Sequence, residues 1–124
     1  MNLNSELSVA VLIPCFQEEE TIGKVVSDFK AVLPSADIYV YDNNSTDNTI
    51  VNARKAGAII RNETLQGKGN VIRRMFADID VDIYVLVDGD DTYDSKFAPE
   101  LINTLITKRV DMVNGARFSD SRGA

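Results

Sequence analysis

The sequence predicts an α/β fold with a Rossmann-like, mostly parallel sheet of about five strands and helices on both faces. Short β-branched segments alternate with amphipathic segments of helical period along the whole chain. The connections between them are short, which favours right-handed crossovers between parallel strands. Neither a linker nor a repeat interrupts the pattern, so residues 1–124 are expected to form a single domain.

The first strand is the β-branched segment 8–13, and Pro14 ends it. Residues 15–21 then open a helix, and the three glutamates at 18–20 suit the positive end of its dipole. Pro34 ends this helix. Its buried stripe consists of apolar residues at helical spacing: Ile22, Val25, Val26, Phe29, Val32 and Leu33.

The second strand is segment 37–41, and a polar turn joins it to a helix at about residues 48–56. Ser45 or Asp47 is the expected N-cap, because either side chain accepts a hydrogen bond from a first-turn N–H group. Gly57 suits the left-handed conformation that closes a helix.

A third strand at 58–61 precedes the segment Gly67-Lys68-Gly69, which opens another helix. The apolar face of that helix consists of Val71, Ile72, Met75, Phe76 and Ile79. After the next strand, a helix begins near Pro99, and a last strand is expected at 110–114. We expect the polar tail 119–124 to be mobile.

The strand that ends at Asp88 leads directly into carboxylates around a glycine, Asp88-Gly89-Asp90. Both aspartates can point at one divalent cation, and magnesium prefers such a pair together with substrate phosphates. A calcium loop of the EF-hand type is excluded, because Tyr93 and Pro99 stand where it needs glycine and glutamate. The alternative is a solvated acidic turn or a helix cap.

Four polar turns are expected at one edge, because the carboxyl ends of parallel strands open on the same side of the sheet. They comprise residues 14–20, 42–47, 67–69 and 88–94. Together they offer amides and carboxylates for a base and ribose, a lysine for phosphate and paired aspartates for a metal. A nucleotide diphosphate with Mg²⁺ or Mn²⁺ would use all of these groups.

Each group also has a structural interpretation. Glu19 and Glu20 fit surface charge better than ligands, and Ser45 and Asp47 fit helix caps. The Gly-Lys-Gly segment is too short for a P-loop. Cys15 fits a small buried hydrophobe, because the sequence has no histidine and no second cysteine to activate it.

Composition excludes several classes of function. The formal charge of −6 argues against a nucleic-acid partner. The absence of histidine excludes imidazole catalysis and histidine-ligated zinc. The single cysteine fits a reducing compartment, and neither a signal peptide nor a membrane span is expected.

These motifs, in this order and spacing over about residues 8–118, resemble the inverting family-two glycosyltransferases of the GT-A fold. Residues 11–19 are similar to the family's IP-x-Y/F-N-E-E opening, and residues 42–49 to its DDGSTDGT turn. Gly67-Lys68-Gly69 with Arg73 resembles its GKGxALR segment, and Asp88-Gly89-Asp90 stands in the place of its metal-binding D-x-D. Gly-Ala-Arg-Phe at 115–118 looks most like the polyprenyl-phosphate sugar synthases, such as dolichyl-phosphate mannosyltransferase.

The resemblance implies roles for particular residues. Asp88 and Asp90 would bind the metal and serve catalysis, with Gly89 between them. The remaining candidates would bind the uridine- or guanosine-diphosphate sugar: Pro14, Phe16 and Glu18 at the base and ribose, Asp42 and Asn43 at the base, Lys68 and Arg73 at the nucleotide or its phosphates, and Arg117 at the donor or acceptor phosphate.

Three residues depart from the family pattern: Gln17 replaces an asparagine, and Asn43 and Asn44 replace an aspartate and a glycine. Asn43 puts the base preference in question, whereas Asn44 still tolerates a positive φ angle. The resemblance also implies that the chain corresponds to the N-terminal half of a family member, so we expect the acceptor-binding half to be absent from it.

The resemblance implies inverting, metal-dependent hexosyl transfer, with polyprenyl phosphate as the expected acceptor in the complete enzyme. That enzyme is expected to be cytoplasmic and peripheral at the inner face of the membrane. An isolated N-terminal half would expose the apolar surface meant for its missing partner, which is compatible with a homodimer or larger oligomer. The alternatives are a non-catalytic nucleotide-binding module, a receiver-like domain and a nucleotidyltransferase. A receiver-like domain is disfavoured because the third strand ends in Arg61-Asn62. A nucleotidyltransferase lacks support because no long glycine-rich loop follows the first strand.

Overall fold

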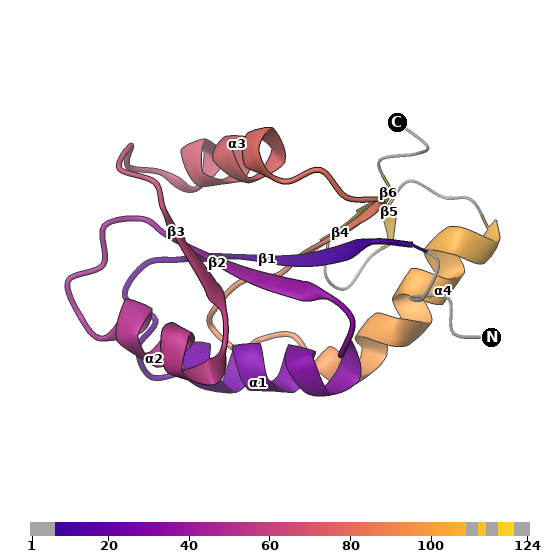
Figure 1. Cartoon of the computed structure of the whole chain (residues 1–124), viewed down its shortest axis with the longest axis horizontal. Helices are drawn as coiled ribbons and strands as arrows, with labels where there is room; N and C mark the ends of the chain where they lie inside the picture. The colour runs from indigo at the N-terminus through magenta and orange to yellow at the C-terminus, as the bar shows by residue number, and fades with distance from the viewer. Residues whose placement is uncertain (1–6, 109–111, 114–116, 121–124) are drawn as a thin grey trace.

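A computed structural model describes residues 7–108, 112–113 and 117–120 of the chain. They form three layers: a central six-stranded sheet, helix α3 on one face, and helices α1, α2 and α4 on the other (Figure 1). This arrangement confirms the predicted α/β fold with helices on both faces. Among the described residues, no helix has both the length and the apolar character needed to cross a membrane.

The sheet has the strand order β3-β2-β1-β4-β6-β5. Strands β3, β2, β1 and β4 are parallel, β6 is antiparallel to β4, and β5 is antiparallel to β6. The bounds of the strands are β1 Val9–Cys15, β2 Asp37–Asp42, β3 Ile59–Asn62, β4 Ile83–Leu86, β5 Met112–Val113 and β6 Arg117–Asp120.

The helices lie close to their predicted positions, with bounds α1 Ile22–Val32, α2 Thr49–Ala56, α3 Lys68–Asp78 and α4 Ala98–Lys108, and a short 3-10 helix η2 at Ser95–Phe97. Gly57 closes α2 at φ 102°, as predicted. Helix α1 starts later than expected, and its first turn holds no acidic residue. The glutamates at 18–20 therefore belong to the loop before α1 and not to its first turn.

The antiparallel end of the sheet agrees with the predicted mostly parallel sheet, and it adds one strand to the expected number of about five. Strand β5 falls within the expected segment 110–114, of which residues 110, 111 and 114 lie outside the described part. Strand β6 was not predicted, because Arg-Phe-Ser-Asp contains one apolar residue and no strand pattern. Ser119 and Asp120, expected in the tail, pair with Tyr84 and Ile83, and residues 121–124 are not described.

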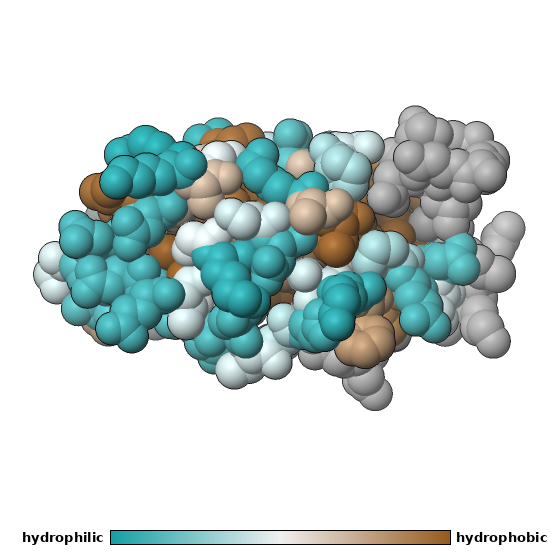
Figure 2. Space-filling view, turned by 90° about the horizontal axis from the view of Figure 1, so that it is seen from below, coloured by the Kyte–Doolittle hydropathy of each residue, from teal (hydrophilic) through white to brown (hydrophobic). Residues whose placement is uncertain are grey.

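Strand β1 is the centre of the core, since all seven of its residues are buried. Val11 and Ile13 pack in the cluster that includes the inner side of α1, and Leu12 packs with Tyr41 and Met75 under α3. The opposite, outer face of α1 and α2 is mainly hydrophilic, with small separate apolar spots (Figure 2). The apolar stripe of α1 therefore points to the sheet, as the helical spacing predicted.

Phe29 tests this packing, because it is 1% exposed and stacks on Tyr93 with ring centroids 6.3 Å apart. We expect Phe29→Ala to lower the free energy of unfolding by about 3–5 kcal/mol, measured by chemical denaturation. Phe97→Ala is the control, since Phe97 is 54% exposed, and it should stay within about 0.5 kcal/mol of the wild type. Similar losses in both variants would contradict the assignment of the core.

Candidate functional site

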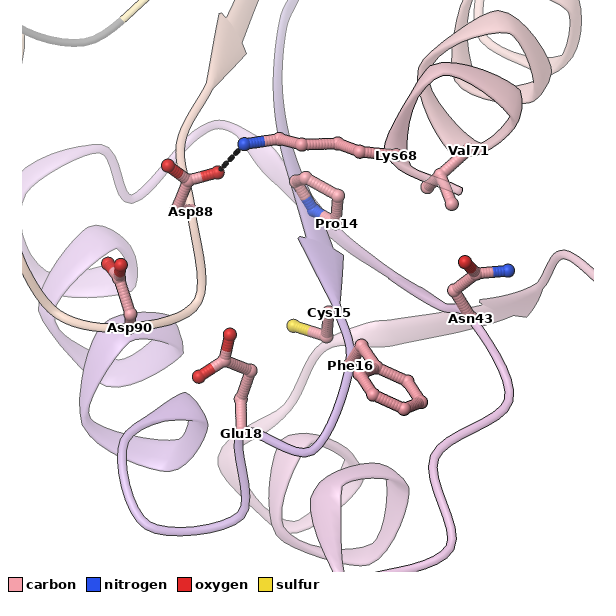
Figure 3. A pocket seen from close by; sticks show the side chains of 9 residues that line it. All are labelled: Pro14, Cys15, Phe16, Glu18, Asn43, Lys68, Val71, Asp88 and Asp90. Atoms are coloured by element: carbon pink, nitrogen blue, oxygen red, sulfur yellow. Dashed lines mark hydrogen bonds and ion pairs between the residues drawn. The ribbon is translucent and has the colours of Figure 1, made fainter. Parts of the chain in front are cut away.

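A pocket of about 260 Å³ opens at the carboxyl ends of the parallel strands. The chain crosses from β1 to β2 in one direction and reaches β4 on the other side of β1, so the loops after β1 and β4 diverge there. Open α/β sheets bind ligands at such a switch point. The pocket is lined by Pro14, Cys15, Phe16, Glu18, Asn43, Lys68, Val71, Asp88 and Asp90 (Figure 3).

One side of the pocket is acidic, with a single lysine. Lys68, the first residue of α3, donates from Nζ to Asp88 Oδ1 at 2.5 Å. Asp90 Oδ1 accepts hydrogen bonds from the N–H of Thr92 at 3.1 Å and from its hydroxyl at 2.7 Å. Figure 3 shows the carboxylates of Asp90 and Glu18 on the same side of the pocket as Asp88. Three carboxylates from two loops and one ammonium from the start of α3 therefore converge.

The negative charges gathered here affect the carboxyl group of Glu18. Its partial burial raises the pKa of its carboxyl, and the negative charges of Asp90 and Asp88 raise that pKa further. Lys68 acts in the opposite direction. The site is therefore short of positive charge, which favours a cation or a cation-bound ligand.

The other side of the pocket is apolar. Phe16 is 52% exposed although it is a large aromatic residue, and Pro14 and Val71 also line the pocket. An exposed ring at the mouth of a pocket offers a face on which a planar group can stack. The pocket thus combines an aromatic platform with a charged end.

Three predicted site residues, Asp42, Arg73 and Gly89, are not among the described residues that line the pocket, and the structure does not describe the side chain of a fourth, Arg117. Asp42 is 2% exposed, and its Oδ2 accepts a hydrogen bond from the N–H of Ser45 at 2.9 Å, while its buried Oδ1 has no hydrogen-bond partner within the described part of the chain. Arg73 is exposed on α3. Arg117 pairs with Leu86 through the backbone of β6, and its side chain is outside the description.

Gly89 has a packing role that the sequence did not reveal. A Cβ atom at this position would lie 2.7 Å from Cys15 Sγ, so any side chain there would require the β1 thiol or the backbone of the acidic turn to shift. The hydroxyl of Thr21 also donates to the Gly89 carbonyl at 2.6 Å. Cys15 is buried, as predicted, and burial together with the charges of Glu18 and Asp42 raises the pKa of its thiol.

Gln17 joins the loop after β1 to the loop after β2, and its backbone adopts φ 55°. Its backbone N–H donates to Ser45 Oγ at 2.9 Å, and its Oε1 accepts from the N–H of Thr46 at 2.7 Å. Ser45 is therefore not the cap of α2. The N-cap is Asn48, which makes no side-chain cap hydrogen bond, so Asp47 is not the cap either, although its Oδ1 accepts a hydrogen bond from the N–H of Thr49 at 3.0 Å.

The pocket also contains residues that sequence analysis did not assign to it, Cys15 and Val71. Cys15 lies between two predicted lining residues, and Val71 follows Lys68 by three positions, which is nearly one helical turn. That spacing was a usable signal for Val71. Among the described residues, no group of three or more His, Cys, Asp or Glu side chains is placed to hold a metal, so Asp88 and Asp90 would form only part of a ligand set.

A Rossmann-like sheet with an acidic pair at its switch point is the arrangement of the nucleotide-binding half of a GT-A glycosyltransferase. The chain belongs to glycosyl transferase family 2, whose sequence model matches residues 10–123. The family indicated by the motifs is thus confirmed.

Individual relatives agree with this assignment. Protein RfbJ of Shigella flexneri is 57% identical over 89% of this chain and 85% of its own length. The dolichyl-phosphate hexose transferase of Haloferax volcanii is 31% identical over 90% of this chain, which spans only 48% of that relative. Glucosyl-3-phosphoglycerate synthase of Mycobacterium tuberculosis, solved with Mn²⁺, uridine-diphosphate-glucose and phosphoglyceric acid, is 27% identical with a TM-score of 0.74, over 84% of this chain and 41% of its own.

The close approach of Gly89 and Cys15 predicts a specific stability effect. Gly89→Ala should lower the free energy of unfolding by about 1–3 kcal/mol, because backbone or sulfur must move to admit the methyl group. The loss should shrink in a Cys15→Ala background, where the sulfur is gone. Gly69→Ala is the control, since a Cβ there meets nothing within 4 Å, and an alanine in α3 should gain about 0.5–1 kcal/mol. Equal losses in both backgrounds would refute the contact.

Glu18 predicts a pH-dependent effect. Because its pKa is raised in the folded state, ionisation of Glu18 lowers stability as the pH rises from the ordinary value of 4.5 through the raised one. Glu18→Gln should therefore be more stable than the wild type near pH 7, and this advantage should vanish at about pH 4, measured by urea denaturation. Glu20→Gln, exposed on the same loop, controls for the loss of one negative charge. A larger advantage at acidic pH would contradict the assigned sign.

Proposed function

We propose that this chain binds a nucleotide-diphosphate sugar, linked to uridine or guanosine diphosphate, together with Mg²⁺ or Mn²⁺. In the complete protein the sugar is transferred with inversion to an acceptor, for which polyprenyl phosphate is our candidate. The observation that carries the proposal is the convergence of Asp88, Asp90 and Lys68 with the Phe16 ring in one pocket at the switch point of the sheet.

The acidic end fits a divalent cation. Asp88 and Asp90 provide hard oxygen ligands, and the contact of Asp88 with the Lys68 ammonium supports the attraction of positive charge to this carboxylate. Diphosphate oxygens and water would complete the ligand set, as magnesium prefers. A cation bound there would neutralise charge on the departing nucleotide diphosphate, which requires no proton donor. The related synthase solved with Mn²⁺ and uridine-diphosphate-glucose supports this assignment.

The apolar end fits the nucleoside. The exposed face of Phe16 is suited to stacking on a base, next to Pro14, and the Glu18 carboxylate is suited to the ribose hydroxyls. The unpartnered buried oxygen of Asp42 supports a role near the base, since a buried acceptor without a donor gains from a ligand N–H group. We keep Lys68 as the phosphate contact, and Arg73 and Arg117 as further phosphate contacts in the complete protein.

An anionic acceptor suits a chain without histidine. A phosphate oxygen is already a nucleophile and requires little general base, so single displacement at the anomeric carbon, with inversion, needs positioning more than proton transfer. The name of the relative dolichyl-phosphate hexose transferase supports a lipid phosphate. If the acceptor is a hydroxyl, a carboxylate from elsewhere in the complete protein is required as base.

The second candidate is nucleotide-sugar binding without turnover. It is favoured by one observation, namely that the chain spans less than half of the dolichyl-phosphate hexose transferase. Donor hydrolysis or sugar transfer by this chain would reject it. Tight binding of the donor with neither reaction would support it.

Calorimetric titration with uridine-, guanosine- and cytidine-diphosphate sugars, with and without Mn²⁺, tests the proposal. The wild type should bind at least one uridine or guanosine donor, and chelation of the metal should weaken that binding at least tenfold. Asp88→Asn or Asp90→Asn should abolish the metal-dependent part, because each removes a charged oxygen ligand. Asp80→Asn, an exposed carboxylate before β4 at the opposite edge, should leave binding unchanged. Metal-dependent binding that survives in both site variants would refute the assignment.

A further inference from the structure

The amide of Asn43 is fully engaged in holding another loop of the protein. Asn43 follows β2 and is 6% exposed. Its Nδ2 donates to the backbone carbonyls of Glu63 at 2.7 Å and Leu65 at 2.9 Å, and its Oδ1 accepts from the N–H of Gly67 at 2.9 Å. Two carbonyl partners and one N–H partner fix the orientation of the amide.

The loop held by Asn43 leads directly to Lys68. Gly67, at φ 117°, is the residue before α3, and its carbonyl accepts the first hydrogen bonds of that helix, from the N–H groups of Asn70 and Val71. Lys68 is the first residue of α3, and it reaches Asp88 across the pocket. An atom that fixes the Gly67 backbone therefore fixes the origin of the Lys68 side chain.

We infer that Asn43 is a positioning residue, which places Lys68 at the phosphate end of the pocket and does not select the base. The inference rests on the proposed function. Asn43 stands where the resembling motif has aspartate, and an aspartate carboxylate has no donor for the carbonyls of Glu63 and Leu65. Of the three hydrogen bonds, an aspartate would keep only the one from Gly67, and it would turn a negative oxygen toward the carbonyls of Glu63 and Leu65.

The inference leads to an unusual expectation, namely that restoring the family's usual residue harms the site. Asn43→Asp should weaken Mn²⁺-dependent binding of uridine diphosphate about tenfold or more, and it should weaken guanosine diphosphate by the same factor. Binding of uridine, which lacks phosphate, should change less than twofold, followed by NMR chemical shifts. A change in the ranking of the bases, or an equal loss for uridine, would overturn the inference.

A double-mutant cycle tests whether Asn43 acts through Lys68. In a Lys68→Met background, Asn43→Asp should cost less than a further twofold in binding of uridine diphosphate. A loss equal to that in the wild-type background would show that Asn43 acts elsewhere. Asn43→Ala provides the same cycle without an added charge if Asn43→Asp fails to fold.

Asn44→Asp is the matched control. Asn44 is exposed, and its Nδ2 donates to the Thr64 carbonyl of the same loop at 3.0 Å, where water can replace it. Its effect on binding should remain below twofold. A loss as large as that of Asn43→Asp would show that any change in this turn disturbs the loop.

Amide hydrogen exchange without ligand separates this inference from the proposed function. In the wild type, the N–H of Gly67 should be protected, and Asn43→Ala should increase its exchange rate at least tenfold, while the N–H of Thr49 in α2 stays unchanged. Unaltered protection of Gly67 would overturn the positioning role. If the wild type binds no nucleotide diphosphate, the proposed function fails, and the exchange result still decides whether Asn43 holds this loop.

Discussion

Hydrogen bonds between loops, made largely by side-chain amides, determine the geometry of the carboxyl edge of this sheet. Gln17 joins the loop after β1 to the turn after β2, and Asn43 joins that turn to the loop before α3. An amide suits this task because it donates and accepts at once, whereas a carboxylate only accepts. The strands place the loops within reach of each other, but these contacts decide where Lys68 and Glu18 stand.

The parallel half of the fold could be predicted from the sequence because each element carries its own periodic pattern, as β1 and the buried stripe of α1 show. Most residues of the pocket were found because strand ends meet at one edge. The antiparallel strand β6 was missed, since its strand conformation comes from pairing with β4 and not from its own composition. The packing of Gly89 on Cys15 was also missed, because a contact across 74 residues leaves no local signal.

The departures from the family pattern have a common physical explanation. Asn44 adopts φ 70°, in agreement with the tolerance expected of asparagine, and it also bonds the Thr64 carbonyl. Gln17 has the reach to bond Thr46. These substitutions exchange glycine or shorter groups for side chains that join loops. The acidic groups left in the pocket repel one another, so the site retains unfavourable charge that a bound ligand would relieve.

The buried thiol beneath the acidic turn can serve as a natural reporter of local opening in this protein. Cys15 is the single cysteine of the chain, and its sulfur is covered by Gly89 and shielded from ionisation. Because Cys15 is only 2% exposed although it lines the pocket, we expect alkylation to require local opening of the structure around it. The rate of alkylation would then report the free energy of that opening, without a fluorophore or an engineered label.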